Sequence, residues 1–86
     1  MKTNFQMLQE LLKVYRPKKR GIICEDEFDL IKNMLCLDEM DVLALRNLRD
    51  FVVASMGQSE NAEDYDRISA ITYCIDHSIF HLGGNV

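Results

Sequence analysis

The sequence predicts an all-α fold, a small antiparallel bundle of three to four helices that dimerises. Residues that favour helices (Leu, Met, Glu, Lys and Arg) are abundant, whereas the 86 residues include one Pro and four Gly. No stretch alternates strictly between apolar and polar residues, as a half-buried strand would. With 48% hydrophobic and 28% charged residues, the composition is that of a globular protein. We therefore expect residues 1–86 to form a single helical domain.

A first helix is predicted over residues 4–15, with Thr3 as its N-cap. Apolar residues recur at helical spacing on one of its faces: Phe5, Leu8, Leu11, Leu12 and Tyr15. Pro17 ends this helix, because a proline disfavours helical geometry in the residue that precedes it. A basic loop over residues 16–21 then leads to the next helix.

A second helix is predicted over residues 25–36. Its start is rich in carboxylates, which the positive end of the helix dipole stabilises: Glu25, Asp26, Glu27 and Asp29. The apolar residues 22–24 that precede it fit either an extended stretch or a hydrophobic staple.

A third helix is predicted over residues 39–56, with Asp38 as its N-cap and Gly57 as a left-handed residue after its end. Its apolar residues cover more than the ~100° stripe that a surface helix buries. They are Met40, Val42, Leu43, Leu45, Leu48, Phe51, Val52, Val53 and Met56. This helix is either the buried hub of a monomeric bundle or part of an interface. The small core of so short a chain favours the interface.

A fourth helix is predicted over residues 61–82, and Gly83 and Gly84 stop it. One side of it is apolar and is expected to face the core: Tyr65, Ile68, Ile71, Ile75, Ile79 and Leu82. Tyr73 and Phe80 lean away from that side, so they add to the apolar surface available to a partner.

The main functional hypothesis is a non-enzymatic regulatory or adaptor protein that forms a homodimer and binds another protein through an apolar helix face. The predicted contact residues are Met40, Leu43, Phe51, Val53, Tyr73 and Phe80. No glycine-rich loop or nucleophile–base pair indicates catalysis, and no cofactor is expected. No secretion signal or bilayer-spanning stretch is present in the sequence, so the expected location is the cytoplasm.

A nucleic-acid-associated transcriptional regulator is the first alternative, because charge is distributed unevenly along the chain. Residues 1–20 hold six Lys and Arg against the single acidic residue Glu10, whereas residues 21–86 hold four against thirteen acids. The basic loop has the composition of a phosphate-binding patch and supplies the candidate contacts: Arg16, Lys18, Lys19 and Arg20.

A metal-binding helical module is the second alternative. Cys74, His77 and His81 fall at positions i, i+3 and i+7 of the fourth helix, so their side chains share a flank. Thiolate and imidazole are ligands that zinc prefers, although this spacing is not a standard zinc signature. The helix dipole explains two histidines near a C-terminus equally well.

The three cysteines are widely spaced and odd in number, so we expect them to be reduced core residues.

Overall fold

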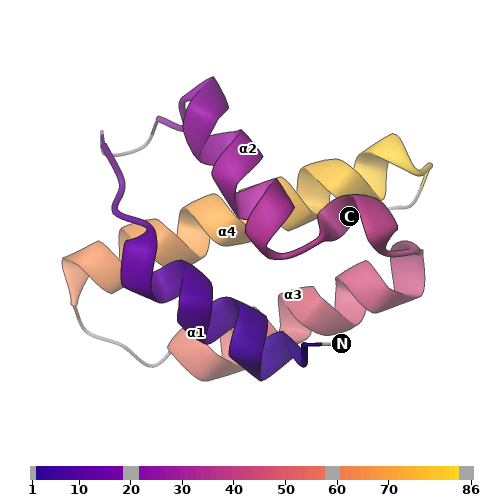
Figure 1. Cartoon of the computed structure of the whole chain (residues 1–86), viewed down its shortest axis with the longest axis horizontal. Helices are drawn as coiled ribbons and strands as arrows, with labels where there is room; N and C mark the ends of the chain where they lie inside the picture. The colour runs from indigo at the N-terminus through magenta and orange to yellow at the C-terminus, as the bar shows by residue number, and fades with distance from the viewer. Residues whose placement is uncertain (1, 19–21, 58–60, 84–86) are drawn as a thin grey trace.

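The computed structural model describes residues 2–18, 22–57 and 61–83 of the chain (Figure 1). Four α-helices pack together in it: α1 (Asn4–Val14), α2 (Glu25–Met34), α3 (Val42–Met56) and α4 (Ala62–His81). A short 3-10 helix, η1 (Leu37–Glu39), lies between α2 and α3. These three ranges contain no strand, so the predicted all-α class is confirmed.

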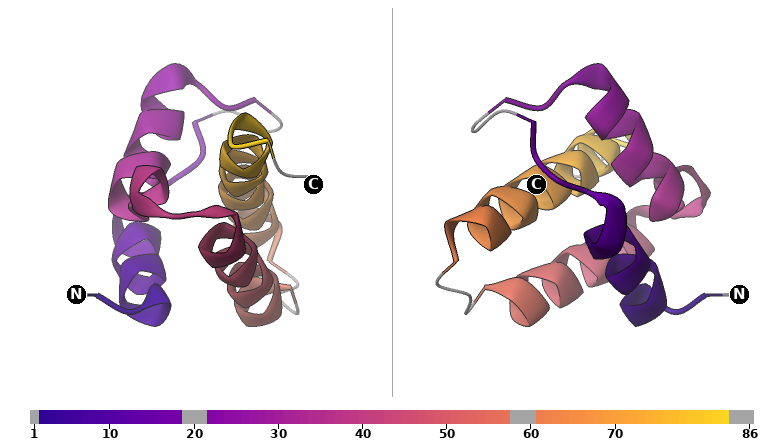
Figure 2. Two further views of the ribbon diagram at one scale, coloured as in Figure 1. Left: turned by 90° about the vertical axis from the view of Figure 1, so that its right-hand side faces the viewer. Right: turned by 60° about the vertical axis from the view of Figure 1, so that its left-hand side comes forward.

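The helices form two layers. In the left-hand view of Figure 2, α1 and α2 make up one layer, and α3 and α4 make up the other. α3 packs against α4 more extensively than any other pair of elements does, while α2 contacts α4 and α1 contacts α3. The core lies where the apolar faces of the two layers meet.

Buried side chains from all four α-helices form one hydrophobic cluster. Its fully buried large members are Leu8, Leu11, Tyr15, Ile31, Leu35, Leu37, Leu45, Leu48, Val52, Ile71, Ile75 and Ile79. Most of the apolar surface of α3 belongs to this core, and half-buried Val42 and Phe51 pack against it. The wide apolar surface predicted for the third helix is therefore mainly buried, and Leu43 and Val53 are its exposed large side chains.

The predicted N-cap of the first helix is confirmed. Thr3 and Gln6 form a reciprocal capping box: the Thr3 hydroxyl accepts the Gln6 N–H at 3.1 Å, and the Gln6 amide oxygen accepts the Thr3 N–H at 2.9 Å. The Asn61 side chain accepts the N–H of Glu63 at 2.8 Å at the start of α4. α1 is one residue shorter than predicted, because Tyr15 adopts an extended conformation ahead of Pro17.

The predicted start of the third helix is wrong. Asp38 lies in η1, and Asp41 is the N-cap of α3, where its side chain accepts the N–H of Ala44 at 2.8 Å. The two aspartates are equally suitable caps by residue type. The cap at Asp41 leaves room for the extra turn of η1, which carries Leu37 into the core.

The second helix is also shorter than the predicted range of residues 25–36. It ends at Met34, and Cys36 takes a left-handed conformation with φ of 54°. A left-handed residue cannot continue a right-handed helix, so the chain turns there toward η1.

The two glycines beside α3 and α4 act differently from one another. Gly57 has φ of −66°, so the prediction of a left-handed residue there is wrong. A β-carbon at Gly57 would lie 2.5 Å from the Val53 carbonyl oxygen, so the position requires glycine for space. Gly83 does take the left-handed conformation, with φ of 84°, after α4. Gly84 lies outside the described residues.

One carboxylate closes the connection between α1 and α2. Glu27 is in the first turn of α2 and is only 3% exposed. Its Oε1 accepts the backbone N–H of Lys18 at 2.7 Å, and its Oε2 accepts the backbone N–H of Cys24 at 2.9 Å. These bonds offset the cost of burying the charge. The acidic start of the second helix therefore contains a residue that also ties Lys18 and Cys24 to α2.

Glutamine at position 27 should destabilise the fold. The Glu27→Gln variant keeps the size of the side chain but offers one oxygen, so one of the two N–H groups loses its acceptor. We expect the free energy of unfolding, measured in urea, to fall by about 1.5–3 kcal/mol. The matched variant Glu25→Gln changes an exposed carboxylate in the same turn and should cost about 0.5 kcal/mol or less. Equal losses in the two variants would contradict this role of Glu27.

Candidate functional site

A large groove opens between the α1–α2 connection and the N-terminal part of α4. Its volume is about 900 Å³. Most of its wall is apolar and comes from Tyr15, Pro17, Ile22, Ile23, Phe28, Tyr65, Ala70 and Tyr73. The more polar part of the wall comes from Cys24, Glu25, Asp66, Ser69 and His77. A concave, mainly apolar wall with a few polar groups is typical of binding sites.

Three large apolar side chains of this groove are more than half exposed. Ile22 is 55% exposed, Tyr65 64% and Tyr73 56%. Tyr65 was predicted to face the core, but its exposed side chain lies on the groove wall instead. Ile23 and Phe28 are half-buried and pack against the core from the two positions that a hydrophobic staple uses around α2.

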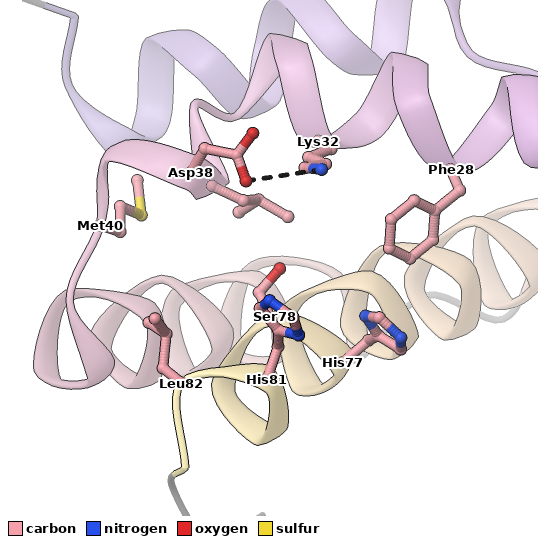
Figure 3. A pocket seen from close by; sticks show the side chains of 9 residues that line it. Phe28, Lys32, Asp38, Met40, His77, Ser78, His81 and Leu82 are labelled. Carbon is pink, nitrogen blue, oxygen red and sulfur yellow. Dashed lines mark ion pairs between the residues drawn. The ribbon is translucent and has the colours of Figure 1, made fainter.

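A smaller crevice of about 160 Å³ lies farther along α4, between α4 and the segment from α2 to Met40. Figure 3 shows His77, Ser78, His81 and Leu82 on the α4 side, opposite Phe28, Lys32, Asp38 and Met40. An ion pair of 3.5 Å joins Lys32 and Asp38 on the side opposite α4.

Phe28 and His77 line both hollows. Their ring centroids are 5.1 Å apart and the rings are nearly perpendicular, which is a favourable edge-to-face contact. The ring of Tyr73 lies 6.4 Å from that of His77 on the groove side. The Phe28–His77 contact therefore stands between the large groove and the small crevice.

The structure distributes the predicted partner-binding residues over several surfaces. Tyr73 lines the large groove, and Met40 lines the small crevice. Phe51 is half-buried against the core. The other three line neither hollow and are exposed by 68%, 43% and 73%: Leu43, Val53 and Phe80. The first turn of α3 and the last turns of α4 lie at the same end of the molecule (Figures 1 and 2).

The described half of the basic loop takes part in the fold. The Arg16 guanidinium donates to the carbonyls of Leu12 and Tyr15 at the end of α1 and pairs with Glu63 at 3.1 Å. Lys18 pairs with Asp26. That hydrogen bond raises the pKa of the Lys18 ammonium and lowers the pKa of the Asp26 carboxyl. Lys19 and Arg20 lie outside the described residues.

The three predicted metal ligands do not come together. Cys74 is fully buried in the core, whereas His77 and His81 are exposed and line the small crevice. No cluster of three or more His, Cys, Asp or Glu side chains suited to a metal ion exists in the part of the chain that the structure describes.

Among the described residues, no helix has the length and apolar character that crossing a membrane requires.

Burial raises the pKa of two core groups, and Glu27 is the second cause for each. Burial, with the Glu27 charge as the second cause, raises the pKa of the Tyr15 phenol from 10.0 to about 12. The same two causes raise the pKa of the Cys74 thiol from 9.0 to about 12. Cys74 is therefore a thiol rather than a reactive thiolate at neutral pH. Cys24 and Cys36 are half-buried, so only Cys74 matches the expected core cysteine fully.

No family model, curated protein or solved structure matches this chain. The site must therefore be judged from its own chemistry. Sequence reasoning placed Tyr73 on a partner surface but missed the rest of the large groove. The apolar residues 22–24, whose conformation the sequence left open, are the signal that the sequence contains.

The raised pKa values predict a loss of stability in alkali. A group whose pKa is higher in the folded state stabilises the fold below its unfolded pKa, and this contribution disappears as the pH rises toward the folded value. The free energy of unfolding should therefore fall between pH 9 and pH 12. Tyr15→Phe should make that fall shallower, and Tyr65→Phe, which changes an exposed phenol, should not. Urea unfolding at a series of pH values measures the slopes, and equal slopes for wild type and Tyr15→Phe would contradict the assignment.

Proposed function

We propose that this protein is a small non-enzymatic regulator or adaptor that binds a protein partner in the large groove and also forms a homodimer. The observation that carries the proposal is an open groove of about 900 Å³ with a mainly apolar wall. Apolar side chains exposed at a concave surface gain free energy when a partner covers them.

The chemistry of the groove favours binding over catalysis. The cysteine nearest to a histidine along α4 is buried and protonated at neutral pH, so it supplies no nucleophile. The polar groups on the wall are spread among apolar ones, and His77 is packed against Phe28. An aromatic wall with a few polar groups suits recognition of a protein segment.

A second surface supports the homodimer. Leu43 and Phe80 belong to neighbouring helices, are strongly exposed, and line neither hollow. In the proposed bundle α3 and α4 run antiparallel, so Leu43 and Phe80 belong to the same end of the bundle, and we propose that they share one apolar patch. A copy of the chain that covers this patch adds to the burial that an 86-residue chain achieves alone.

A photo-crosslink in the groove tests partner binding. A photoreactive phenylalanine analogue replaces Ser69, an exposed residue on the groove wall, in the protein expressed in its own host. We expect illumination to join the chain to a distinct protein. The same analogue at Ser55, which is exposed on α3 outside both hollows, is the matched control and should give no such product. An identical pattern from the two positions would contradict groove binding.

Sedimentation tests the homodimer separately. We expect the purified chain to sediment as a dimer at micromolar concentration, because a second copy would bury the exposed apolar side chains of Leu43 and Phe80. The double variant Leu43→Lys, Phe80→Lys should shift the dissociation constant by more than about tenfold. The matched change Phe5→Lys alters an exposed phenylalanine of α1 and should leave the dimer intact. A monomer across the micromolar range would refute the dimer.

A further inference from the structure

We infer that the homodimer forms through the outer face of α4, where a second copy of the chain lies antiparallel and covers Tyr65, Tyr73 and Phe80. The inference rests on the homodimer of the proposed function and assigns its surface and its geometry. It also assigns a regulation to the large groove, because Tyr65 and Tyr73 line that groove. A partner in the groove and the second copy therefore compete for the same two side chains.

The outer face of α4 carries most of the exposed aromatic side chains of the described residues. Phe5 of α1 is one, and the other three belong to α4: Tyr65, Tyr73 and Phe80, at 64%, 56% and 73% exposure. At 3.6 residues per turn these three lie within about 80° of one another, on the side opposite the buried residues of the helix. From Tyr65 to Phe80 the face is about 22 Å long. It is therefore one continuous surface rather than three isolated side chains.

The area of this face fits what a dimer needs. A tyrosine or phenylalanine side chain buries about 150–250 Å², so three rings at these exposures leave roughly 400 Å² in water on each copy. A standard interface buries about 800 Å² per partner. The three rings thus supply about half of it. Ser69, which is exposed between the rings, and Leu43, which we place beside Phe80, add to the rest.

The order of residues along the face fits an antiparallel second copy. In a two-fold pair with its axis beside Tyr73, Tyr65 of one copy meets Phe80 of the other. Aromatic rings then pair at both ends of the contact, which is favourable. The same register sets the small Ser69 against Asp76 of the second copy. A parallel pair would instead set each Asp76 against its equivalent.

The charge in the middle of the face is compatible with this contact. The Asp76 carboxylate is half-buried and pairs with the Arg49 guanidinium of α3 at 2.6 Å. The antiparallel register places a hydroxyl rather than a carboxylate opposite it, so like charges do not meet there. A second copy also brings the same aromatic rings to the contact, which an unrelated protein has to supply from a different sequence.

Engineered cysteines test the geometry. In a background of Cys24→Ser and Cys36→Ser, the variants Tyr65→Cys and Phe80→Cys are purified, mixed and treated with a short bis-maleimide. We expect a covalent dimer from the mixture and at least about tenfold less from either variant alone. In the antiparallel pair, two copies of the same position lie about 22 Å apart along the helices.

Two further positions calibrate the crosslink. Tyr73→Cys lies beside the proposed two-fold axis, so this single variant should crosslink to itself. Ser55→Cys is exposed on α3, away from the outer face of α4, and should give no covalent dimer.

Sedimentation measures the contribution of the face. Tyr73→Lys should weaken the dimer by more than about tenfold, because it places a charge near the centre of the contact. Val14→Lys changes an exposed apolar side chain of α1 and should leave the dissociation constant unchanged. Both variants should keep the helical circular dichroism of the wild type, since both positions are exposed.

The competition with the groove partner has its own readout. Phe80 does not line the groove, so Phe80→Lys removes the second copy without changing the groove wall. In the host, this variant should raise the yield of the Ser69 photo-crosslink to the distinct protein by about twofold or more, because more groove is open. Phe5→Lys should leave that yield unchanged. An unchanged yield in Phe80→Lys would overturn the competition.

The outcomes separate this inference from the proposed function. A dimer that neither crosslinks in the cysteine mixture nor weakens in Tyr73→Lys uses another surface, so the inference is overturned while the homodimer stands. Crosslinking of Tyr65→Cys to itself without crosslinking in the mixture would show a parallel pair and overturn the geometry. A monomer across the micromolar range overturns both the homodimer and the inference, and leaves groove binding to the Ser69 crosslink.

Discussion

The Glu27 carboxylate accepts backbone N–H groups from both sides of the α1–α2 connection, and the position of the large groove depends on these two bonds. One wall of the groove includes Pro17, Ile22 and Ile23 of the α1–α2 connection, and the opposite wall is α4. Because the bonds of Glu27 hold the backbone of Lys18 and Cys24 to α2, Ile22 and Ile23 keep their position beside α4. The same carboxylate lies close enough to Tyr15 and Cys74 to raise their pKa values, so it links the groove to the core.

The helices were predictable from the sequence because caps and periodicity are local signals. Thr3 and Asn61 stand at helix starts by residue type, and apolar spacing marks the faces that become buried. The start of α3 was not predictable in this way. Asp38 and Asp41 are equally good caps, and the burial of Leu37 between them decides which is used. That burial depends on contacts between layers, which no local pattern contains.

The candidate site was less predictable than the fold, because distant segments build it. The connection after α1, the start of α2 and the first half of α4 all line the groove. Tyr73 could be assigned to a surface from its angle on one helix, but Tyr65 could not, since its angle matches the core stripe. The same limit explains the metal hypothesis. Cys74 and His81 lie close in angle around α4, yet Cys74 is buried in the core and His81 lines the small crevice.

The bonds made by Glu27 join its side chain to the main chain of Lys18, which has consequences for how the sequence can diverge. A backbone N–H is present in every residue except proline, so almost any side chain at position 18 preserves the bond. The exposed side chain of Ile22 is likewise not required by the closure of the connection. Related chains are therefore free to change the chemistry of this wall, and with it the specificity of the proposed binding site, while Glu27 keeps the same framework beneath it.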